Sequence, residues 1–196
     1  MGHHVTPEPD LTLMATTINT HTFFMVQPCG PQGWLVETDR RGNLLGRLSR
    51  PQPTEVPAEP IGVNIQVPGP LLDIAWTLPM TPLVTEEVKA VIEEVTPGSV
   101  QWIPATILGH PGTRYFLNLL QEVMVDDLTP HPEVDTRSDE DFLPDLCVRR
   151  RDLPVEHHIF QINKNGGPVG LPWAMMTATL RKALAPFSGL AYKQAI

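Results

Sequence analysis

The pattern of apolar and polar residues is most regular at 61–67, where isoleucine and valine alternate with glycine, asparagine and glutamine. A period of two residues is typical of a strand with one buried face, so we expect a strand there. The turn-forming run Pro68-Gly69-Pro70 ends it. Shorter apolar runs beside turn residues predict further strands at 22–26, 34–36, 99–103, 158–162 and 189–193.

Two other segments have the three- and four-residue spacing of an amphipathic helix. Thr85 is a candidate N-cap of the first helix and Thr177 of the second, and Pro97-Gly98 and Pro186 end them. The apolar stripes consist of Val88, Val91, Ile92 and Val95 in the first helix and of Leu180, Ala183, Leu184 and Phe187 in the second. A strand is expected after each helix, so a helix-then-strand arrangement occurs twice. This single match does not establish a duplication.

The residue pattern of segment 115–125 is compatible with either a strand or a helix. Its aromatic residues and its alternation favour a strand, whereas Phe116, Leu119, Leu120 and Val123 would also lie on one face of a helix. We expect the strand.

Proline accounts for 22 of the 196 residues, about twice its usual share. Because proline removes a backbone donor and restricts φ, it disfavours a helix bundle, a coiled coil and an all-parallel sheet. We therefore expect an α+β fold with a mixed or antiparallel sheet, two short helices and long proline-rich loops.

We expect two parts that share one continuous core. Residues 1–69 form an N-terminal arm and a strand-rich, proline-rich segment, and residues 70–196 form an α+β domain. Met1 to His4 resemble a vector remnant, and no signal peptide or membrane span is recognisable. Cys29 and Cys147 are too few for a disulfide framework, so we expect reduced thiols and a cytoplasmic protein.

The formal charge is −8, from 14 basic and 22 acidic residues. A protein that binds nucleic acid normally has a basic surface, so we expect no nucleic-acid partner, whereas a basic protein partner is permitted. The charge is concentrated at 126–145, where one basic residue, Arg137, accompanies eight acidic residues. These are Asp126, Asp127, Glu133, Asp135, Asp139, Glu140, Asp141 and Asp145.

This acidic segment has three interpretations. It is a solvated loop, a docking surface that attracts a basic partner, or a divalent cation site, although 139–141 lacks the oxygen spacing and the glycine of a calcium loop. The adjoining Arg149-Arg150-Arg151 is interpreted as an internal clamp on it. Trp173 belongs either to the core or to an exposed apolar patch that contacts the partner.

The chain lacks the motifs of common catalytic sites. No Cys or His recurs at zinc spacing, and neither a nucleophile elbow nor a phosphate loop is present. We therefore expect no metal, no cofactor and no catalytic residue. The alternative is an enzyme site assembled from distant residues such as Tyr115, Asn118 and His110.

The order of segments over residues 70–196 resembles a bacterial immunity-protein family of polymorphic toxin systems, the eleventh in the immunity series and formerly a domain of unknown function. The residues that carry the resemblance are Pro70-Leu71-Leu72-Asp73, Leu83-Val84-Thr85-Glu86-Glu87-Val88-Lys89, Tyr115-Phe116-Leu117-Asn118-Leu119-Leu120, Val125-Asp126-Asp127-Leu128, Arg137-Ser138, Ile159-Phe160-Gln161, Leu180-Arg181-Lys182-Ala183-Leu184 and Gly189-Leu190.

The resemblance implies a role without catalysis. Proteins of this family are thought to bind and neutralise a toxin encoded beside them, and the partner expected here is a toxin with a basic surface. The alternatives are a scaffold or regulatory binding subunit of a secretion system and the enzyme described above.

Overall fold

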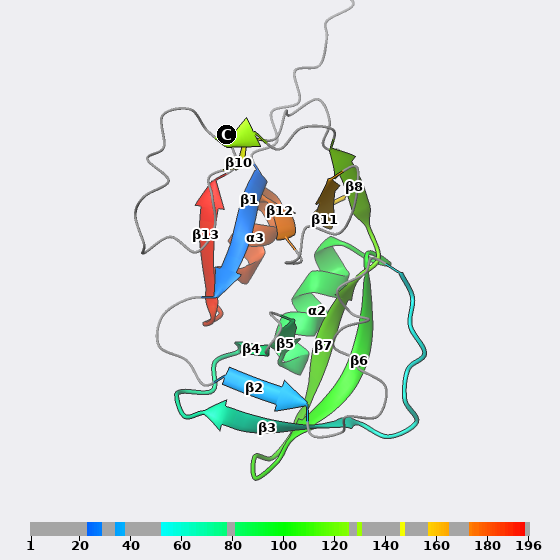
Figure 1. Cartoon of the computed structure of the whole chain (residues 1–196), viewed down its shortest axis with the longest axis vertical. Helices are drawn as coiled ribbons and strands as arrows, with labels where there is room; N and C mark the ends of the chain where they lie inside the picture. Colours follow the sequence, from blue (N-terminus) through cyan, green and yellow to red (C-terminus); the bar gives the residue numbers. More distant parts are fainter. Residues whose placement is uncertain are drawn as a thin grey trace, which may run out of the picture.

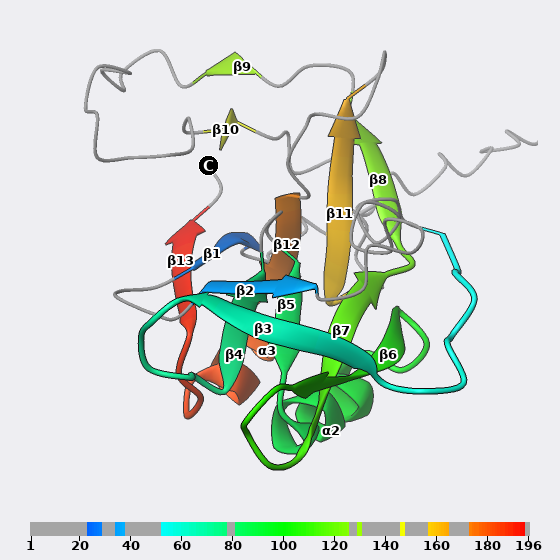
Figure 2. The same ribbon diagram turned by 60° about the horizontal axis from the view of Figure 1, so that its bottom comes forward.

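Six strands form a closed barrel in the computed structural model of the chain, which describes residues 23–28, 34–37, 52–77, 81–125, 129–130, 146–147, 157–164 and 173–194. The strand order is β2-β3-β6-β7-β5-β4, and a parallel pairing of β2 with β4 closes it (Figure 2). The strands are β2 (Trp34–Glu37), β3 (Ile61–Val67), β4 (Ile74–Thr77), β5 (Pro82–Val84), β6 (Val100–Ile107) and β7 (Thr113–Leu119).

The inside of the barrel is an apolar core. Alternate residues of each strand point inward, as the period of two predicts for β3. The buried members are Leu35, Ile61, Val63, Ala75, Leu83, Ile103, Ala105, Ile107 and Phe116.

A five-stranded sheet in the order β13-β1-β12-β11-β8 lies beside the barrel (Figure 1). Only β8 and β11 pair in parallel within it. The strands are β1 (Phe23–Pro28), β8 (Glu122–Val125), β11 (Ile159–Lys164), β12 (Trp173–Thr177) and β13 (Leu190–Gln194). The short strands β9 (Thr129–Pro130) and β10 (Leu146–Cys147) pair antiparallel. The sheet is therefore mixed, and the predicted α+β class is confirmed.

Two helices, α2 (Glu86–Val95) and α3 (Ala178–Leu184), pack against each other between the barrel and the sheet. The hydroxyl of Thr85 accepts a hydrogen bond from the N–H of Val88, and that of Thr177 accepts one from Leu180, so both predicted caps are confirmed. Neither helix of the described residues is long and apolar enough to cross a membrane.

A second apolar core surrounds these helices. It combines the outer face of the barrel, the buried stripes of α2 and α3, and one face of the five-stranded sheet. Its buried members are Ile74, Val84, Val88, Ile92, Leu117, Leu119, Ile159, Met176, Leu180 and Leu184. Phe160 and Met175, which alternate with this face, are also buried, so β11 and β12 are buried on both faces at these positions.

The two halves of the molecule repeat one arrangement. In the barrel, β4 and β5 pair antiparallel, α2 crosses over, and β6 returns parallel to β5 with β7 between them. In the sheet, β11 and β12 pair antiparallel, α3 crosses over, and β13 returns parallel to β12 with β1 between them. The predicted helix-then-strand arrangement is therefore part of a longer match in topology. The strand β1, which precedes the rest of its half in sequence, takes the position of β7.

The second helix ends at Leu184, just before Pro186, as predicted, because proline cannot continue the hydrogen-bond ladder; Phe187 of the predicted stripe therefore follows the helix. One predicted strand has other bounds. The strand expected at 99–103 runs on to Ile107 through Pro104, which β6 tolerates because its pairing with β3 begins only at Ala105. The segment 115–125 is extended, as expected, in two strands. Strands β4, β5, β9, β10 and β12 were not predicted.

Candidate functional site

The structure does not describe the carboxylates that the sequence placed at the docking surface. Asp126, Asp127, Glu133, Asp135, Asp139, Glu140, Asp141 and Asp145 all lie outside the described residues. Trp173 begins β12 and pairs with Ile162, but its side chain is outside the description. The docking role of these residues stays a prediction, as does the clamp at 149–151.

The described residues contain another acidic surface, on α2. Glu86, Glu87, Glu93 and Glu94 are exposed, because the apolar stripe through Val88 and Ile92 turns the opposite side of the helix to solvent. Lys89 is the one basic residue of the helix. We call the exposed side of residues 86–94 the acidic face.

One end of the acidic face is fixed to the barrel by Tyr115. The ammonium group of Lys89 lies 4.2 Å from the centre of the Tyr115 ring and 3.1 Å from Oε1 of Glu86. A hydrogen bond from Tyr115, followed by Lys89, lowers the pKa of the Glu86 carboxyl, and the same bond raises the pKa of the Tyr115 hydroxyl. Burial alone would lower the pKa of the Lys89 ammonium group. The hydrogen bond to Glu86 and its negative charge raise that pKa by more, so it lies above its ordinary value. Glu93 and Glu94 have no such fixed partner among the described residues.

A second polar cluster joins the two halves of the fold. Asp73, just before β4, accepts hydrogen bonds from the backbone N–H of Ser188 at 2.8 Å and from its hydroxyl at 2.7 Å. The backbone N–H of Ser188 is the main cause that lowers the pKa of Asp73, and Arg114 adds to it. Arg114 also donates to the carbonyl of Leu72 at 2.6 Å, while burial lowers its own pKa. The cluster is a structural joint, because its donors and acceptors satisfy one another.

We expect Asp73→Asn to lower the free energy of unfolding by about 1 kcal/mol at pH 7, because a carboxylate accepts these hydrogen bonds better than an amide. The folded-state pKa of Asp73 lies below its ordinary value of 3.8, so its contribution is present above that value and is lost as the pH falls through the folded pKa. Urea unfolding at pH 7 and pH 3 measures this, and the two chains should differ less at pH 3. Glu55→Gln, on an exposed segment, is the matched control and should leave the free energy of unfolding unchanged at both pH 7 and pH 3.

Gly189 brings the same two halves into backbone contact. Its φ of +110° is a conformation that L side chains rarely adopt, and an added Cβ would lie 2.0 Å from the carbonyl oxygen of Ile74. The indole N–H of Trp76 donates to the carbonyl of Gly189 at 3.0 Å. The joint therefore combines close backbone packing with the polar cluster around Asp73.

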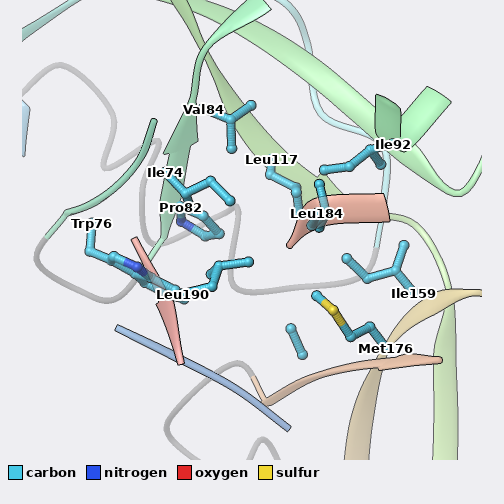
Figure 3. A pocket seen from close by; sticks show the side chains of 11 residues that line it. Ile74, Trp76, Pro82, Val84, Ile92, Leu117, Ile159, Met176, Leu184 and Leu190 are labelled. Atoms are coloured by element: carbon cyan, nitrogen blue, oxygen red, sulfur yellow. The ribbon is translucent and has the colours of Figure 1, made fainter. Parts of the chain in front are cut away.

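A cavity of about 30 Å³ lies beneath this joint, in the second core (Figure 3). The residues that line it are Ile74, Trp76, Pro82, Val84, Ile92, Leu117, Ile159, Ala174, Met176, Leu184 and Leu190. Three pairs among them occupy matching places in the two halves: Ile74 with Ile159, Val84 with Met176, and Ile92 with Leu184. The cavity is far smaller than a metabolite site, and its lining is apolar, which is typical of a gap in core packing.

The residues proposed for the alternative enzyme site point apart. Tyr115 lies on the outer face of β7, against α2, whereas Asn118 points to the inner face and is fully buried. The Asn118 amide donates to Gln101 and to the carbonyl of Gln52, while its own carbonyl oxygen accepts no hydrogen bond from any described residue. His110 lies in the exposed turn between β6 and β7. The structure therefore does not bring these three side chains together.

The acidic face could have been found from the sequence. Pairs of glutamates at 86–87 and 93–94 flank an apolar stripe in helical phase, which places them on the side that faces solvent. No sequence signal indicates the joint at Asp73 and Ser188, because its partners are 115 residues apart.

Within the described ranges, no three His, Cys, Asp or Glu side chains are grouped closely enough to hold a metal ion. No protein-family model matches the chain, and no curated protein matches it. The resemblance of residues 70–196 to an immunity family therefore stays a prediction.

Proposed function

We propose that this chain is an immunity protein that binds a cognate antibacterial toxin in the cytoplasm and neutralises it by stoichiometric occlusion. The observation that supports this best is the acidic face of α2, whose exposed carboxylates outnumber its one lysine. A toxin that acts on nucleic acid needs a basic surface, and such a surface is complementary to this face. The order of segments over 70–196 is the second support.

The acidic face is built on a rigid element. The helix is capped by Thr85, anchored in the second core through Val88 and Ile92, and tied to β7 through Tyr115. A helix held in this way keeps its backbone in place when a partner approaches, so little backbone entropy is lost on binding. The acidic segment at 126–145 would add charge for long-range attraction.

The polar side chains of the described residues also fit a binding protein better than an enzyme. Asp73 and Ser188 satisfy each other, Trp76 bonds to a backbone carbonyl, and Gln101 holds Asn118 and the segment at Thr54. Each of these groups serves the fold. Function then rests on the surface, where the acidic face lies.

The first test is co-expression of the chain with the toxin candidate encoded by the neighbouring gene. Growth should be rescued, and the two proteins should purify as a stoichiometric complex. A toxin that remains fully active, with no complex formed, would overturn the proposal.

The double variant Glu93→Lys/Glu94→Lys should slow association with that toxin by about tenfold at low salt and flatten its salt dependence. The matched control is Glu55→Lys/Glu59→Lys, which makes the same change in net charge on the exposed segment 52–60. Stopped-flow or surface-binding kinetics at several salt concentrations measure both. Equal slowing by the two variants would show that net charge matters and the acidic face does not.

A further inference from the structure

A side-chain amide of the barrel binds the main chain of a neighbouring segment. Oε1 of Gln101, on β6, accepts a hydrogen bond from the N–H of Thr54 at 2.9 Å, and Nε2 donates to the Thr54 carbonyl at 2.7 Å. Two residues that face each other in a hydrogen-bonded pair of an antiparallel ladder exchange the same two bonds. The Gln101 side chain therefore pairs with Thr54 as a residue of an adjacent strand would.

Asn118 extends this polar contact on the neighbouring strand β7, directly opposite Gln101. Its Nδ2 donates to Oε1 of Gln101 at 2.9 Å and to the carbonyl of Gln52 at 3.0 Å. Because both partners are acceptors, they fix which end of the amide carries the N–H groups. Oδ1 of Asn118 is buried and accepts no hydrogen bond from any described residue. Asn118 thus makes one of the two kinds of bond that Gln101 makes.

The segment that lies on these two amides, residues 52–60, is held by its main chain. We call it the strap, and it is the cyan trace that passes β6 and leads into β3 in Figure 1. Most of its side chains are exposed, and that of Val56 is 45 % exposed. Pro53, between the two bound residues, has no N–H, and the strap gives Oδ1 of Asn118 no donor. The contacts therefore select extended backbone and not particular side chains.

We propose that Gln101 and Asn118 form a binding site for the main chain of an extended peptide. The strap occupies this site in the free chain, where its hydrogen bonds serve the fold, and an extended segment of a protein partner takes its place. The segment that fits best has a residue other than proline where the strap has Pro53, because it then offers a further N–H for Oδ1 of Asn118. A donor for this buried acceptor favours the partner's segment over the strap.

This site goes beyond the proposed function, because it recognises backbone and not charge. Main-chain hydrogen bonds to an extended segment are a recurring mode of peptide recognition. The strap competes with any peptide from within the same chain, at an effective concentration in the millimolar range. Weakening the strap should therefore expose the site, and synthetic peptides then measure binding without a toxin.

Thr54→Pro should open the site, because proline has no N–H for Oε1 of Gln101. Thr54→Ala is the matched control, since it keeps that N–H and changes only the side chain. The probe is the acetylated and amidated peptide Gln-Ala-Thr-Glu-Val, which is the sequence of 52–56 with alanine in place of its proline. It should shift the side-chain NH₂ signals of Gln101 and Asn118 in NMR spectra and bind Thr54→Pro about tenfold more tightly than Thr54→Ala. Equal binding, or shifts confined to other residues, would overturn the proposal.

Two further peptides test which atoms the site recognises. A peptide with proline at its second position should bind Thr54→Pro about fivefold more weakly, because it lacks the N–H for Oδ1 of Asn118. A peptide with an N-methyl group on its threonine should also bind about fivefold more weakly, since that N–H pairs with Gln101. Valine in place of the threonine leaves the main chain unchanged and should have no effect. Equal affinity of the alanine peptide and either of the first two would contradict main-chain recognition at this site.

The parent chain supplies an independent measurement, which holds even if Thr54→Pro does not fold. Millimolar alanine peptide should raise the hydrogen-exchange rate of the Thr54 N–H about twofold, because the displaced strap exposes it to solvent. Amides shared by β6 and β7 should exchange as before. If the Gln101 and Asn118 signals shift while exchange at Thr54 stays unchanged, the peptide binds beside the strap, and its replacement of the strap is refuted.

Discussion

Replacement of Gly189 by alanine should lower the free energy of unfolding by about 4 kcal/mol or more, an exceptional loss for one methyl group. The φ of +110° is strained for alanine, and the new Cβ would lie 2.0 Å from the carbonyl oxygen of Ile74. The backbone cannot move aside at low cost, because the N–H of Ile74 donates to Ser188 and the indole of Trp76 donates to Gly189. A loss of this size lowers Tm by about 8–16 °C in a chain of this length.

Gly98→Ala is the matched control for this variant. Gly98 lies in the turn between α2 and β6, in the place that Gly189 has between α3 and β13, and its φ is +74°. An added Cβ meets nothing within 4 Å there, so only backbone strain of about 1 kcal/mol is expected. Urea and thermal unfolding of the two variants compare the losses. Similar losses would mean that backbone strain, and not the contact with Ile74, explains the requirement for glycine at 189.

Local signals in the sequence predicted the elements whose structure is decided locally. Thr85 and Thr177 cap their helices because each offers a hydroxyl three residues before an amide that needs an acceptor. The strand at 61–67 alternates because the barrel buries one of its faces and leaves the other partly exposed. In these cases residues close in sequence determine the secondary structure, so the sequence predicts it.

The missed strands are those whose structure depends on distant partners. All four residues of β4 are buried, so no alternation marks it, and β5 has only three residues. Closure of the barrel depends on the pairing of Trp34 with Trp76, and β1 enters the sheet between two strands from the other end of the chain. No pattern within one segment indicates such pairings.

The candidate site likewise has one part that the sequence indicates and one part that depends on distant residues. Helical phase places Glu93 and Glu94 on the acidic face, so this surface could be derived from sequence alone. The joint of Asp73 with Ser188 joins residues that are 115 positions apart in the chain, so no local pattern indicates it. The match in topology between the two halves explains why the cavity is lined by pairs such as Ile92 and Leu184, since corresponding side chains of the two halves meet there.

Leu184→Ala is expected to lower the free energy of unfolding by about 4 kcal/mol, near the upper end of the usual range for a buried leucine. Leu184 is 1 % exposed and already borders a cavity of about 30 Å³, so the space left by its side chain joins an existing one. The cost of such a substitution rises with the volume of the resulting cavity. Urea unfolding measures the loss, and Leu108→Ala is the control, because Leu108 is 56 % exposed and its truncation should cost little.

The enlarged cavity should also bind xenon, because a space lined by apolar side chains stays dry and accepts small apolar guests. Xenon under pressure should shift the NMR signals of the Ile92, Ile159 and Met176 methyl groups in Leu184→Ala, and it should raise the stability of that variant. The parent chain and Leu108→Ala should show much smaller shifts. If Leu184→Ala loses much less stability than expected and binds no xenon, the two helices have collapsed into the space. The corresponding residue pairs would then pack as an adaptable layer between the barrel and the sheet, and not as a rigid one.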